Sequence, residues 1–211
     1  YALVVEEIAK GCASHALGVA AHNSLGCMPL LGFGTEEQKK KYLPKAASGE
    51  MLVSYGLTEP SAGSDAGGTK TTAVLDGDQW VINGSKSWIT NANYAGLYVL
   101  TALTDAEKGT SGGITAFLVE RDTPGFSIGK KEDNMGQRAS DTRAITFENV
   151  VVPNSAILGE GLAPVGLGDP LYERQPQAEL AALVTRRQLH ERRDRDPVVR
   201  VRVADELVLH A

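Results

Sequence analysis

The chain has 211 residues, of which 42% are apolar and 22% charged, a composition typical of globular proteins with one sizeable core or two small domains. Its net charge of −5 argues against binding to nucleic acid or to an anionic membrane, because both favour basic proteins. Two cysteines, Cys12 and Cys27, are too few for a disulfide framework and fit a reducing compartment. No apolar run approaches the roughly 18 residues of a membrane span, and no signal peptide is visible.

The first third of the chain has a helical pattern. Apolar residues recur at helical spacing from residue 2 to about residue 31, which predicts one or two buried helices with a break or close-packing point at Gly11. Thr35 and Gln38 form a capping-box pattern. We therefore predict a further short helix from Thr35 to about Pro44.

After Gly49 the pattern changes to β-rich segments separated by turn signals, which predicts an antiparallel β domain. Asp76-Gly77 and Asn83-Gly84 predict hairpin turns, because both dipeptides tolerate positive φ. The predicted strands are 52–58, 69–75, 79–82, 86–90, 97–103, 114–119 and 145–152.

The composition changes again after Gly161. Residues 1–161 contain ten Lys and three Arg, whereas residues 162–211 contain eight Arg and no Lys. Residues 177–193 could form a helix and residues 198–203 a strand, while eight acidic residues balance the arginines and argue against a nucleic-acid patch. We expect a truncated or frame-shifted reading of a longer gene, and a genuine divergent tail is the alternative.

A small-residue loop follows the first predicted strand. The strand stops at Pro60, which lacks the N–H needed for a ladder. Residues 61–63 have little or no side chain, so several backbone N–H groups could converge on one anion, with the hydroxyls of Thr58 and Ser64 as further donors. No Rossmann or P-loop pattern is present. The loop therefore predicts a different kind of phosphate site, and an ordinary strand-ending turn is the alternative.

A second motif contains Trp88 and Thr90. Two residues apart on a strand, their side chains are predicted to share one face, which would suit a flat heteroaromatic ligand.

Together these motifs resemble the flavin-binding signature of the acyl-CoA dehydrogenases. The matching runs are Leu57-Thr58-Glu59-Pro60, Ala62-Gly63-Ser64-Asp65, Asn83-Gly84-Ser85-Lys86 and Trp88-Ile89-Thr90-Asn91. The resemblance implies an α+β fold: the end of an N-terminal helical domain (1–50), then an antiparallel β-barrel middle domain (51–161) that holds the flavin and acyl-CoA site. The family's C-terminal helical domain is not recognisable, and residues 162–211 form an unmatched tail.

The resemblance also implies a set of site residues for FAD. Thr58 and its neighbouring backbone would face the pyrimidine edge of the flavin, and the backbone of residues 62–64 would face the pyrophosphate. Thr90 would place its hydroxyl near flavin N5, Trp88 would pack against the ring, and Ser64 would also lie near the acyl-CoA. Donors at the pyrimidine edge would favour the reduced flavin. The expected cofactor-binding residues are Tyr55, Leu57, Thr58, Ala62, Gly63, Ser64, Trp88, Ile89 and Thr90.

Three other segments match less specifically. Residues 134–138 and 140–143 resemble a run near the family's domain junction, although a surface loop in which Arg138 and Arg143 pair with acids is the alternative. Residues 104–113 form a polar, exposed loop that corresponds to one able to touch CoA. Residues 19–26 resemble the helix that lines the acyl pocket in medium- and short-chain members, with a plain buried helix as the alternative.

No metal site is expected, because the spacing of the candidate ligands does not fit a usual zinc pattern. The candidates are Cys12, His15, His22 and Cys27.

The implied activity is α,β-desaturation of an acyl-CoA to the trans-2-enoyl-CoA, in fatty-acid β-oxidation or branched-chain amino-acid catabolism. Electron-transfer flavoprotein would accept the electrons, and a complete chain would form a homo-oligomer, a tetramer in the family. A bacterial cytoplasm is favoured over the mitochondrial matrix. The catalytic residue is unknown, because the family's Glu base comes from the C-terminal helical domain, and Glu59 is expected to be structural. The alternatives are an acyl-CoA oxidase or flavin monooxygenase of the same fold, and a non-catalytic fragment.

Overall fold

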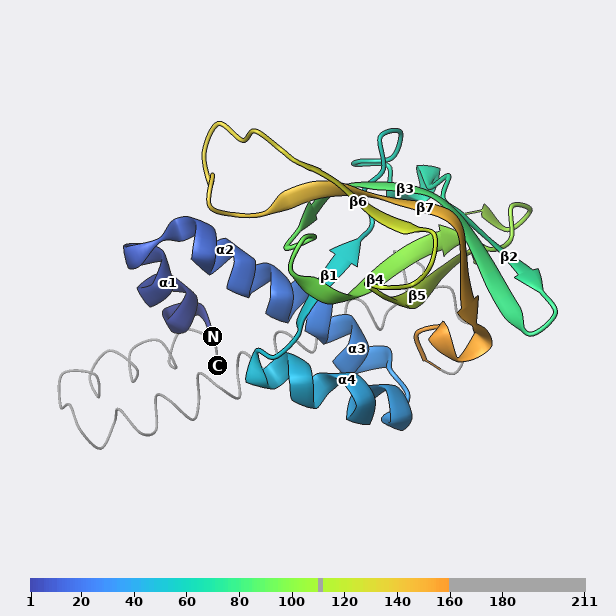
Figure 1. The fold of residues 1–211 in the computed structure, drawn as a ribbon, viewed down its shortest axis with the longest axis horizontal. Helices are drawn as coiled ribbons and strands as arrows, with labels where there is room; N and C mark the ends of the chain where they lie inside the picture. The colour runs from blue at the N-terminus through green and yellow to red at the C-terminus, as the bar shows by residue number, and fades with distance from the viewer. Residues whose placement is uncertain (110–111, 160–211) are drawn as a thin grey trace, which may run out of the picture.

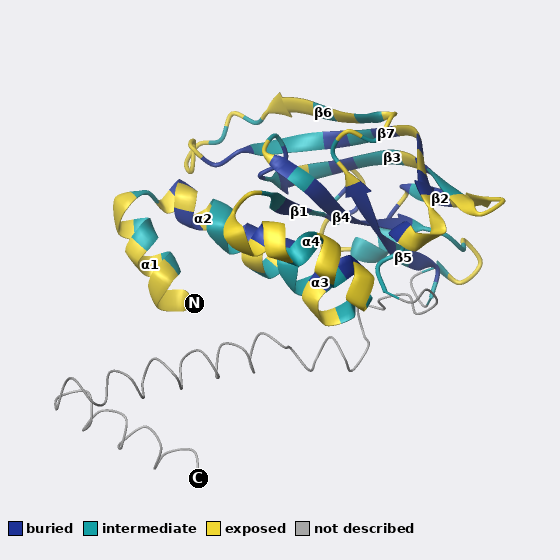
Figure 2. Ribbon diagram, turned by 60° about the horizontal axis from the view of Figure 1, so that its bottom comes forward, coloured by how far each residue is buried: buried dark blue, intermediate teal, exposed yellow. Residues whose placement is uncertain are grey.

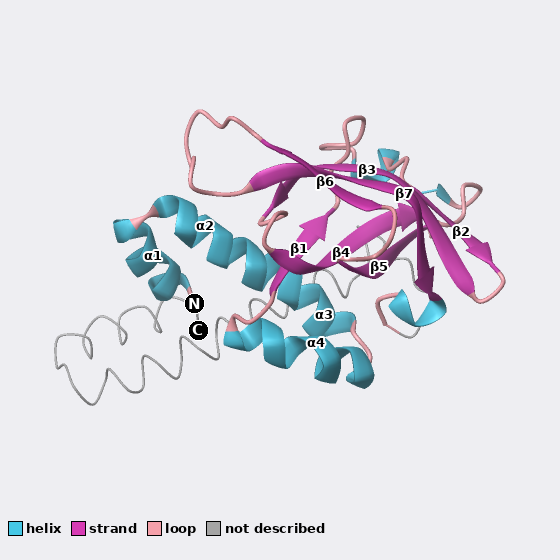
Figure 3. Ribbon diagram, in the orientation of Figure 1, coloured by secondary structure: helices cyan, strands magenta, loops and turns pink. Residues whose placement is uncertain are grey.

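The computed structural model describes residues 1–109 and 112–159, and the predictions for the tail fall outside these residues. In the described part, the N-terminal helices pack beside a curled sheet (Figure 1). The chain changes from helix to strand between Ser48 and Leu52, and the α-helices lie apart from the strands (Figure 3). This arrangement confirms the predicted α+β fold class.

The helical region begins with α1 (Ala2–Gly11) and α2 (Ala13–Ala21), continues through a π-helical turn (His22–Cys27) into α3 (Met28–Phe33), and ends with α4 (Glu36–Ser48). Helix α1 stops at the predicted break, because the residue that follows takes an extended conformation. No residue of α1 is buried, so the prediction of a buried first helix is wrong.

The run Ala13–Phe33 is long and apolar enough to cross a membrane, judged by length and composition alone. By this measure the prediction that no apolar run approaches that length is wrong. Its contacts with the sheet show why such a run also suits a globular domain, because Leu30 is fully buried against Val53 and Leu97 of the sheet.

Helix α4 carries the predicted capping box: Gln38 N–H donates to Thr35 Oγ1 (3.2 Å), and Thr35 N–H donates to Gln38 Oε1 (3.0 Å). The helix continues past Pro44, so its predicted end is wrong. The burial of Ala46 stabilises the last turn, and Gly49, at φ 78°, ends the helix in the left-handed conformation that glycine tolerates best.

The sheet has the strand order β1-β4-β2-β3-β7-β6, with β5 paired to β4. Most pairings are antiparallel, as predicted, but β1 runs parallel to β4, and a single parallel bridge joins β2 to β4. Short 3-10 turns occupy Ala66–Gly68 and Asn154–Ala156. The strands are β1 (Leu52–Gly56), β2 (Thr72–Asp76), β3 (Gln79–Thr90), β4 (Ala95–Leu103), β5 (Ile114–Glu120), β6 (Phe126–Lys131) and β7 (Thr142–Pro153).

One of the two predicted hairpin turns is confirmed. Asp76-Gly77 joins β2 to β3, with Gly77 at φ 62°. Asn83-Gly84 instead lies inside β3, which unites the strands predicted at 79–82 and 86–90 and carries a register shift at this point. A Cβ on Gly84 would lie 2.6 Å from Thr71 Oγ1, so glycine is required here for close packing against the neighbouring backbone.

The buried residues lie mainly on the strands (Figure 2), and the buried side chains form two clusters. One lies within the curled sheet and includes Tyr98, Phe117 and Phe147. The other joins the helices to the sheet and includes Leu30 and Val53. The helices therefore pack against the strand that leads into the predicted flavin loop.

The π-helical turn caps the edge strand β1. Val53 N–H donates to His22 Nδ1 (3.0 Å), and His22 Nε2 donates to Ala46 O (3.1 Å), so His22 is held as the neutral Nε2–H tautomer. Gly26 lies against the same strand, since a Cβ on it would be 2.3 Å from Val53 O. These contacts fix the position of β1 relative to the helices.

Candidate functional site

The chain leaves β1 at Gly56 and forms a loop before it enters β2. Glu59 N–H donates to Ala62 O (2.9 Å), and Ala62 N–H donates to Glu59 O (3.1 Å), which closes a tight turn with Pro60 at its first central position. The Ala62 amide is thus used inside the turn and cannot also bind an anion. Gly63 and Ser64 remain exposed, and a Cβ on Gly63 would meet no atom within 4 Å.

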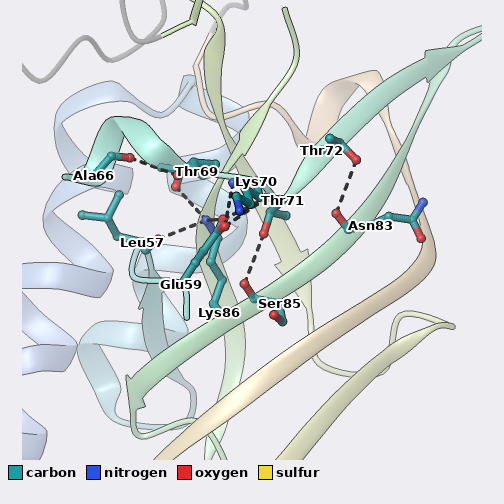
Figure 4. A network of polar contacts seen from close by, with 11 residues as sticks. Leu57, Glu59, Ala66, Thr69, Lys70, Thr71, Thr72, Asn83, Ser85 and Lys86 are labelled. Carbon is teal, nitrogen blue, oxygen red and sulfur yellow. Dashed lines mark hydrogen bonds and ion pairs between the residues drawn. The ribbon is translucent and has the colours of Figure 1, made fainter. Parts of the chain in front are cut away.

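A buried ion pair lies beneath this loop (Figure 4). Lys86 Nζ on β3 donates to Glu59 Oε1 (2.7 Å), Leu57 O (3.1 Å) and Thr101 Oγ1 (3.3 Å). The side chain of Lys86 is 0% exposed and that of Glu59 is 4% exposed. Since the ammonium has three N–H groups and three acceptors, its hydrogen-bonding capacity is filled.

The Glu59 carboxylate also holds the far end of the loop. It accepts hydrogen bonds from the backbone N–H groups of Lys70 (2.7 Å) and Thr71 (3.1 Å), immediately before β2 (Figure 4). Burial opposes the charge on this carboxylate, but the bonds from Lys86, Lys70 and Thr71 outweigh that cost and hold the pKa of Glu59 below its ordinary value of 4.5. Burial lowers the pKa of Lys86, and Glu59 offsets part of this effect. Glu59 is structural, as predicted.

This pKa shift predicts a pH dependence of stability. A carboxyl whose pKa is lower in the folded than in the unfolded chain stabilises the fold above its unfolded pKa, and this contribution is lost as the pH falls through the folded value. We therefore expect Glu59→Gln to reduce the steepness with which the free energy of unfolding falls below pH 4.5. Urea unfolding at a series of pH values measures this slope, and an unchanged slope in the variant would contradict the assignment.

The two halves of the sequence motif lie side by side. Ser87 N–H on β3 donates to Thr58 O (2.7 Å), and Ser54 Oγ on β1 donates to Thr90 O (2.7 Å). The loop therefore meets β3 within three residues of Thr90. The Glu59–Ala62 segment is itself a strand-ending turn, and what the fold adds is its attachment to β3.

The end of β3 is irregular where the motif predicts a regular strand. A register shift lies between Lys86 and Ile89, and Trp88 has φ 62°. Trp88 is nevertheless 61% exposed, Ile89 is 2% exposed and Thr90 is partly exposed, so burial alternates along these residues. An exposed indole beside a partly exposed hydroxyl leaves a surface on which a planar ring could stack.

The predicted cofactor residues therefore differ in what they can offer. The side chain of Ile89 is buried, so only its backbone could face a ligand, whereas Ala62 is buried and its N–H and C=O are both used inside the turn. Tyr55 packs against the core cluster shared with the helices. Leu57 and Thr58 are partly exposed. The exposed or partly exposed positions are Tyr55, Leu57, Thr58, Gly63, Ser64, Trp88 and Thr90.

The second matching run borders the same end of β3. Asp141 O accepts a hydrogen bond from Asn91 N–H (2.7 Å), and the Asp141 carboxylate accepts from Asn93 N–H (2.7 Å) and from Arg143 Nε (2.7 Å). Arg143 thus pairs with an acid, but one that is buried. Arg138 Nε bonds to a backbone carbonyl instead of an acid. The run therefore supports the residues that follow Thr90.

The segment 19–26 contains the buried His22 described above. Cys27 Sγ lies 3.6 Å from His22 Nε2, and burial raises the pKa of the Cys27 thiol to about 11, which makes it a poor metal ligand. Among residues 1–109 and 112–159, no group of three or more potential ligands is placed to hold a metal ion.

The sequence motifs included Lys86, but its burial was not foreseen. Lys86 lies on a strand whose Ile82 and Ile89 face the core, and this position indicates a buried lysine. Because a lysine is rarely fully buried without a partner, it also indicates that an acidic partner is present. The partner, Glu59, is distant in sequence and could not be assigned from spacing.

The profile described as "Acyl-CoA dehydrogenase, N-terminal domain" matches residues 1–50, and "Acyl-CoA dehydrogenase, middle domain" matches residues 54–150. The chain is 52% identical over 160 residues to the probable acyl-CoA dehydrogenase YngJ of Bacillus subtilis, a match that covers 76% of this chain and 42% of that protein.

Solved structures give the same result. Butyryl-CoA dehydrogenase from Megasphaera elsdenii superposes with a TM-score of 0.73 at 46% identity, covering 79% of this chain and 42% of that one. A glutaryl-CoA dehydrogenase from Mycobacterium smegmatis, in complex with FADH2, gives 0.71 at 37% identity, covering 77% and 41%. The chain spans about two fifths of the length of the curated relatives that it matches. Because two successive domains of one family match in order, with the expected fold, the chain belongs to the acyl-CoA dehydrogenase family.

Proposed function

We propose that this chain carries the flavin side of an acyl-CoA dehydrogenase site, with FAD as cofactor. The reaction would be α,β-desaturation of an acyl-CoA thioester to the trans-2-enoyl-CoA, with electrons passed to an electron-transfer flavoprotein. The whole site would need the remainder of a longer protein, since the matched relatives are more than twice as long as the matched segment.

The observation that supports this proposal best is the 2.7 Å hydrogen bond between Ser87 N–H and Thr58 O. It brings the loop with exposed Ser64 next to the strand end with exposed Trp88. A donor-rich loop beside an aromatic surface suits a ligand that has both a phosphate group and a planar ring.

The residues present fit FAD. The loop offers the hydroxyls of Thr58 and Ser64 and the open backbone at Gly63, and β3 offers the Trp88 ring and the Thr90 hydroxyl. The chemistry that FAD supplies when bound is acceptance of a hydride equivalent. In this proposal Thr58 donates to the pyrimidine edge, Thr90 orients the reactive face, and Trp88 shields it from water.

We propose no described residue as the base that removes the α-proton of the substrate. Glu59 is buried and committed to Lys86, and therefore unavailable for proton transfer. Ser64, which is exposed in the loop, is proposed to contact the acyl-CoA.

Titration of the purified chain with FAD, followed by visible absorbance and flavin fluorescence, tests the cofactor. We expect Thr58→Val and Thr90→Val each to weaken binding by about 3- to 10-fold, the effect of losing one neutral hydrogen bond. Thr146→Val, at a partly buried position on β7, is the matched control and should bind FAD as the wild type does. A wild-type chain that binds no FAD would refute the proposal.

A further inference from the structure

The buried Lys86 is bonded to the carbonyl of the peptide that joins Leu57 to Thr58. Its Nζ lies 3.1 Å from Leu57 O, while the Thr58 carbonyl of the next peptide faces Ser87 N–H. Both carbonyl groups on either side of the Thr58 Cα are therefore held from β3 (Figure 4 shows the Leu57 contact).

The hydrogen bond from Lys86 to Leu57 O also affects the Thr58 N–H, which belongs to the same peptide. All peptide bonds in the described residues are trans, so the Thr58 N–H points away from the carbonyl that Lys86 binds. A hydrogen bond from a cation to a carbonyl polarises the peptide and strengthens its N–H as a donor, and the effect is larger in a buried, low-dielectric setting.

Glu59 offsets the free-energy cost of burying the Lys86 ammonium. It pairs with Lys86 at 2.7 Å and also binds the backbone N–H groups of Lys70 and Thr71. The charge of Lys86 is thus balanced by Glu59, a residue of the loop itself. The Glu59–Lys86 pair holds both ends of this loop.

We propose that Lys86 is a positioning residue that polarises the Leu57–Thr58 peptide and so strengthens the Thr58 N–H as a donor to the reduced flavin, with Glu59 balancing its charge. This inference rests on the proposed function, because it requires FAD to lie against Thr58. Lys86 would touch no ligand, but it would set how strongly the bound flavin favours its reduced state.

The test compares two variants. The double variant combines Glu59→Gln and Lys86→Met, so both charges are removed together. In Glu59→Gln alone, Lys86 keeps its bond to Leu57 O. Binding of oxidised and reduced FAD to each folded chain gives the ratio of the two dissociation constants. In the double variant we expect reduced FAD to lose about tenfold in affinity relative to oxidised FAD, which is about 30 mV toward negative potential for a two-electron couple. In Glu59→Gln alone, measured at a pH low enough to keep Lys86 protonated, the shift should have the opposite sign, because the cation is then uncompensated.

A merely structural role for the pair would move both variants in the same direction, and that result would overturn the inference. The carbonyl ¹³C shift of Leu57, measured by NMR without flavin, gives a second readout: it should move upfield in the double variant and stay near the wild-type value in Glu59→Gln. The control is the double variant Lys41→Met with Glu120→Gln, which removes an exposed pair with a 2.8 Å contact and should change neither quantity.

The outcomes separate the two proposals. If the wild-type chain binds no FAD, the proposed function fails and this inference fails with it. If the wild type binds FAD but the double variant keeps the wild-type affinity ratio, the inference alone fails.

Discussion

Replacing Lys86 with Met while Glu59 is retained is expected to lower the free energy of unfolding by about 3–5 kcal/mol, the usual cost of breaking a buried ion pair by removing one partner. The Glu59 carboxylate would be left 4% exposed with no counter-charge. Leu57 O and Thr101 Oγ1 would also lose their donor. Urea unfolding followed by circular dichroism measures the loss, as a lower midpoint at unchanged slope.

Two comparison variants make this prediction specific. The double variant Glu59→Gln with Lys86→Met should recover part of the loss, because no isolated charge remains and the Gln oxygen can still accept from Thr71 N–H. Lys41→Met breaks an exposed pair with Glu120 and should change stability by no more than about 1 kcal/mol. If Lys86→Met lowered the free energy of unfolding no more than Lys41→Met does, the buried Glu59–Lys86 pair would not be important for stability.

Gly26→Ala is expected to destabilise the chain by about 3 kcal/mol, at the upper end of the cost of overpacking. A Cβ at this position would lie 2.3 Å from Val53 O and 2.7 Å from Val53 C, and a backbone neighbour cannot rotate away as a side chain could. The helix and β1 would have to separate, which would strain the His22 bonds to Val53 and Ala46.

Gly32→Ala is the matched control, since it lies in α3 of the same helical run and a Cβ there meets no atom within 4 Å. Because alanine favours helix more than glycine does, we expect this control to be neutral or to stabilise the chain by up to about 1 kcal/mol. The thermal unfolding midpoint should therefore fall in Gly26→Ala and stay the same or rise in Gly32→Ala. If the two alanine substitutions shifted the unfolding midpoint by a similar amount, the close helix–strand contact at Gly26 would not be what makes a Cβ unfavourable there.

Local sequence signals predicted the features that depend on local chemistry. The capping box at Thr35, the turn at Asp76-Gly77 and the change from helical to strand periodicity near Gly49 are all confirmed. Each of these rests on a residue type that satisfies a nearby backbone group or tolerates a special φ. The proximity of Thr58 to the end of β3 followed from family resemblance, and the structure agrees with it.

The errors arose where distant contacts decide the conformation. Asn83-Gly84 has the composition of a hairpin turn, but Thr71 packs against Gly84 and β7 pairs with the strand on both sides of it, so the chain continues straight on. Strand β6 was not predicted because its residues, including Gly129 and two lysines, are mostly exposed, and pairing with β7 alone makes it a strand. The candidate site shows the same limit, since the Glu59–Lys86 pair joins residues 27 positions apart.

The parallel pairing of β1 with β4 affects the order in which the chain can fold. Leu52 pairs with Ala95 and Gly56 with Leu100, so more than forty residues must be synthesised after β1 before its partner exists. A contact of such long sequence separation is closed late and slows folding, whereas the β2–β3 hairpin can form at once. The cluster that joins the N-terminal helices to the sheet includes Leu97 and Val99 of β4 as well as Val53 of β1. During synthesis, part of the helices' apolar surface therefore stays uncovered until β4 has been made, an interval in which a chaperone that binds apolar surface would find its best target.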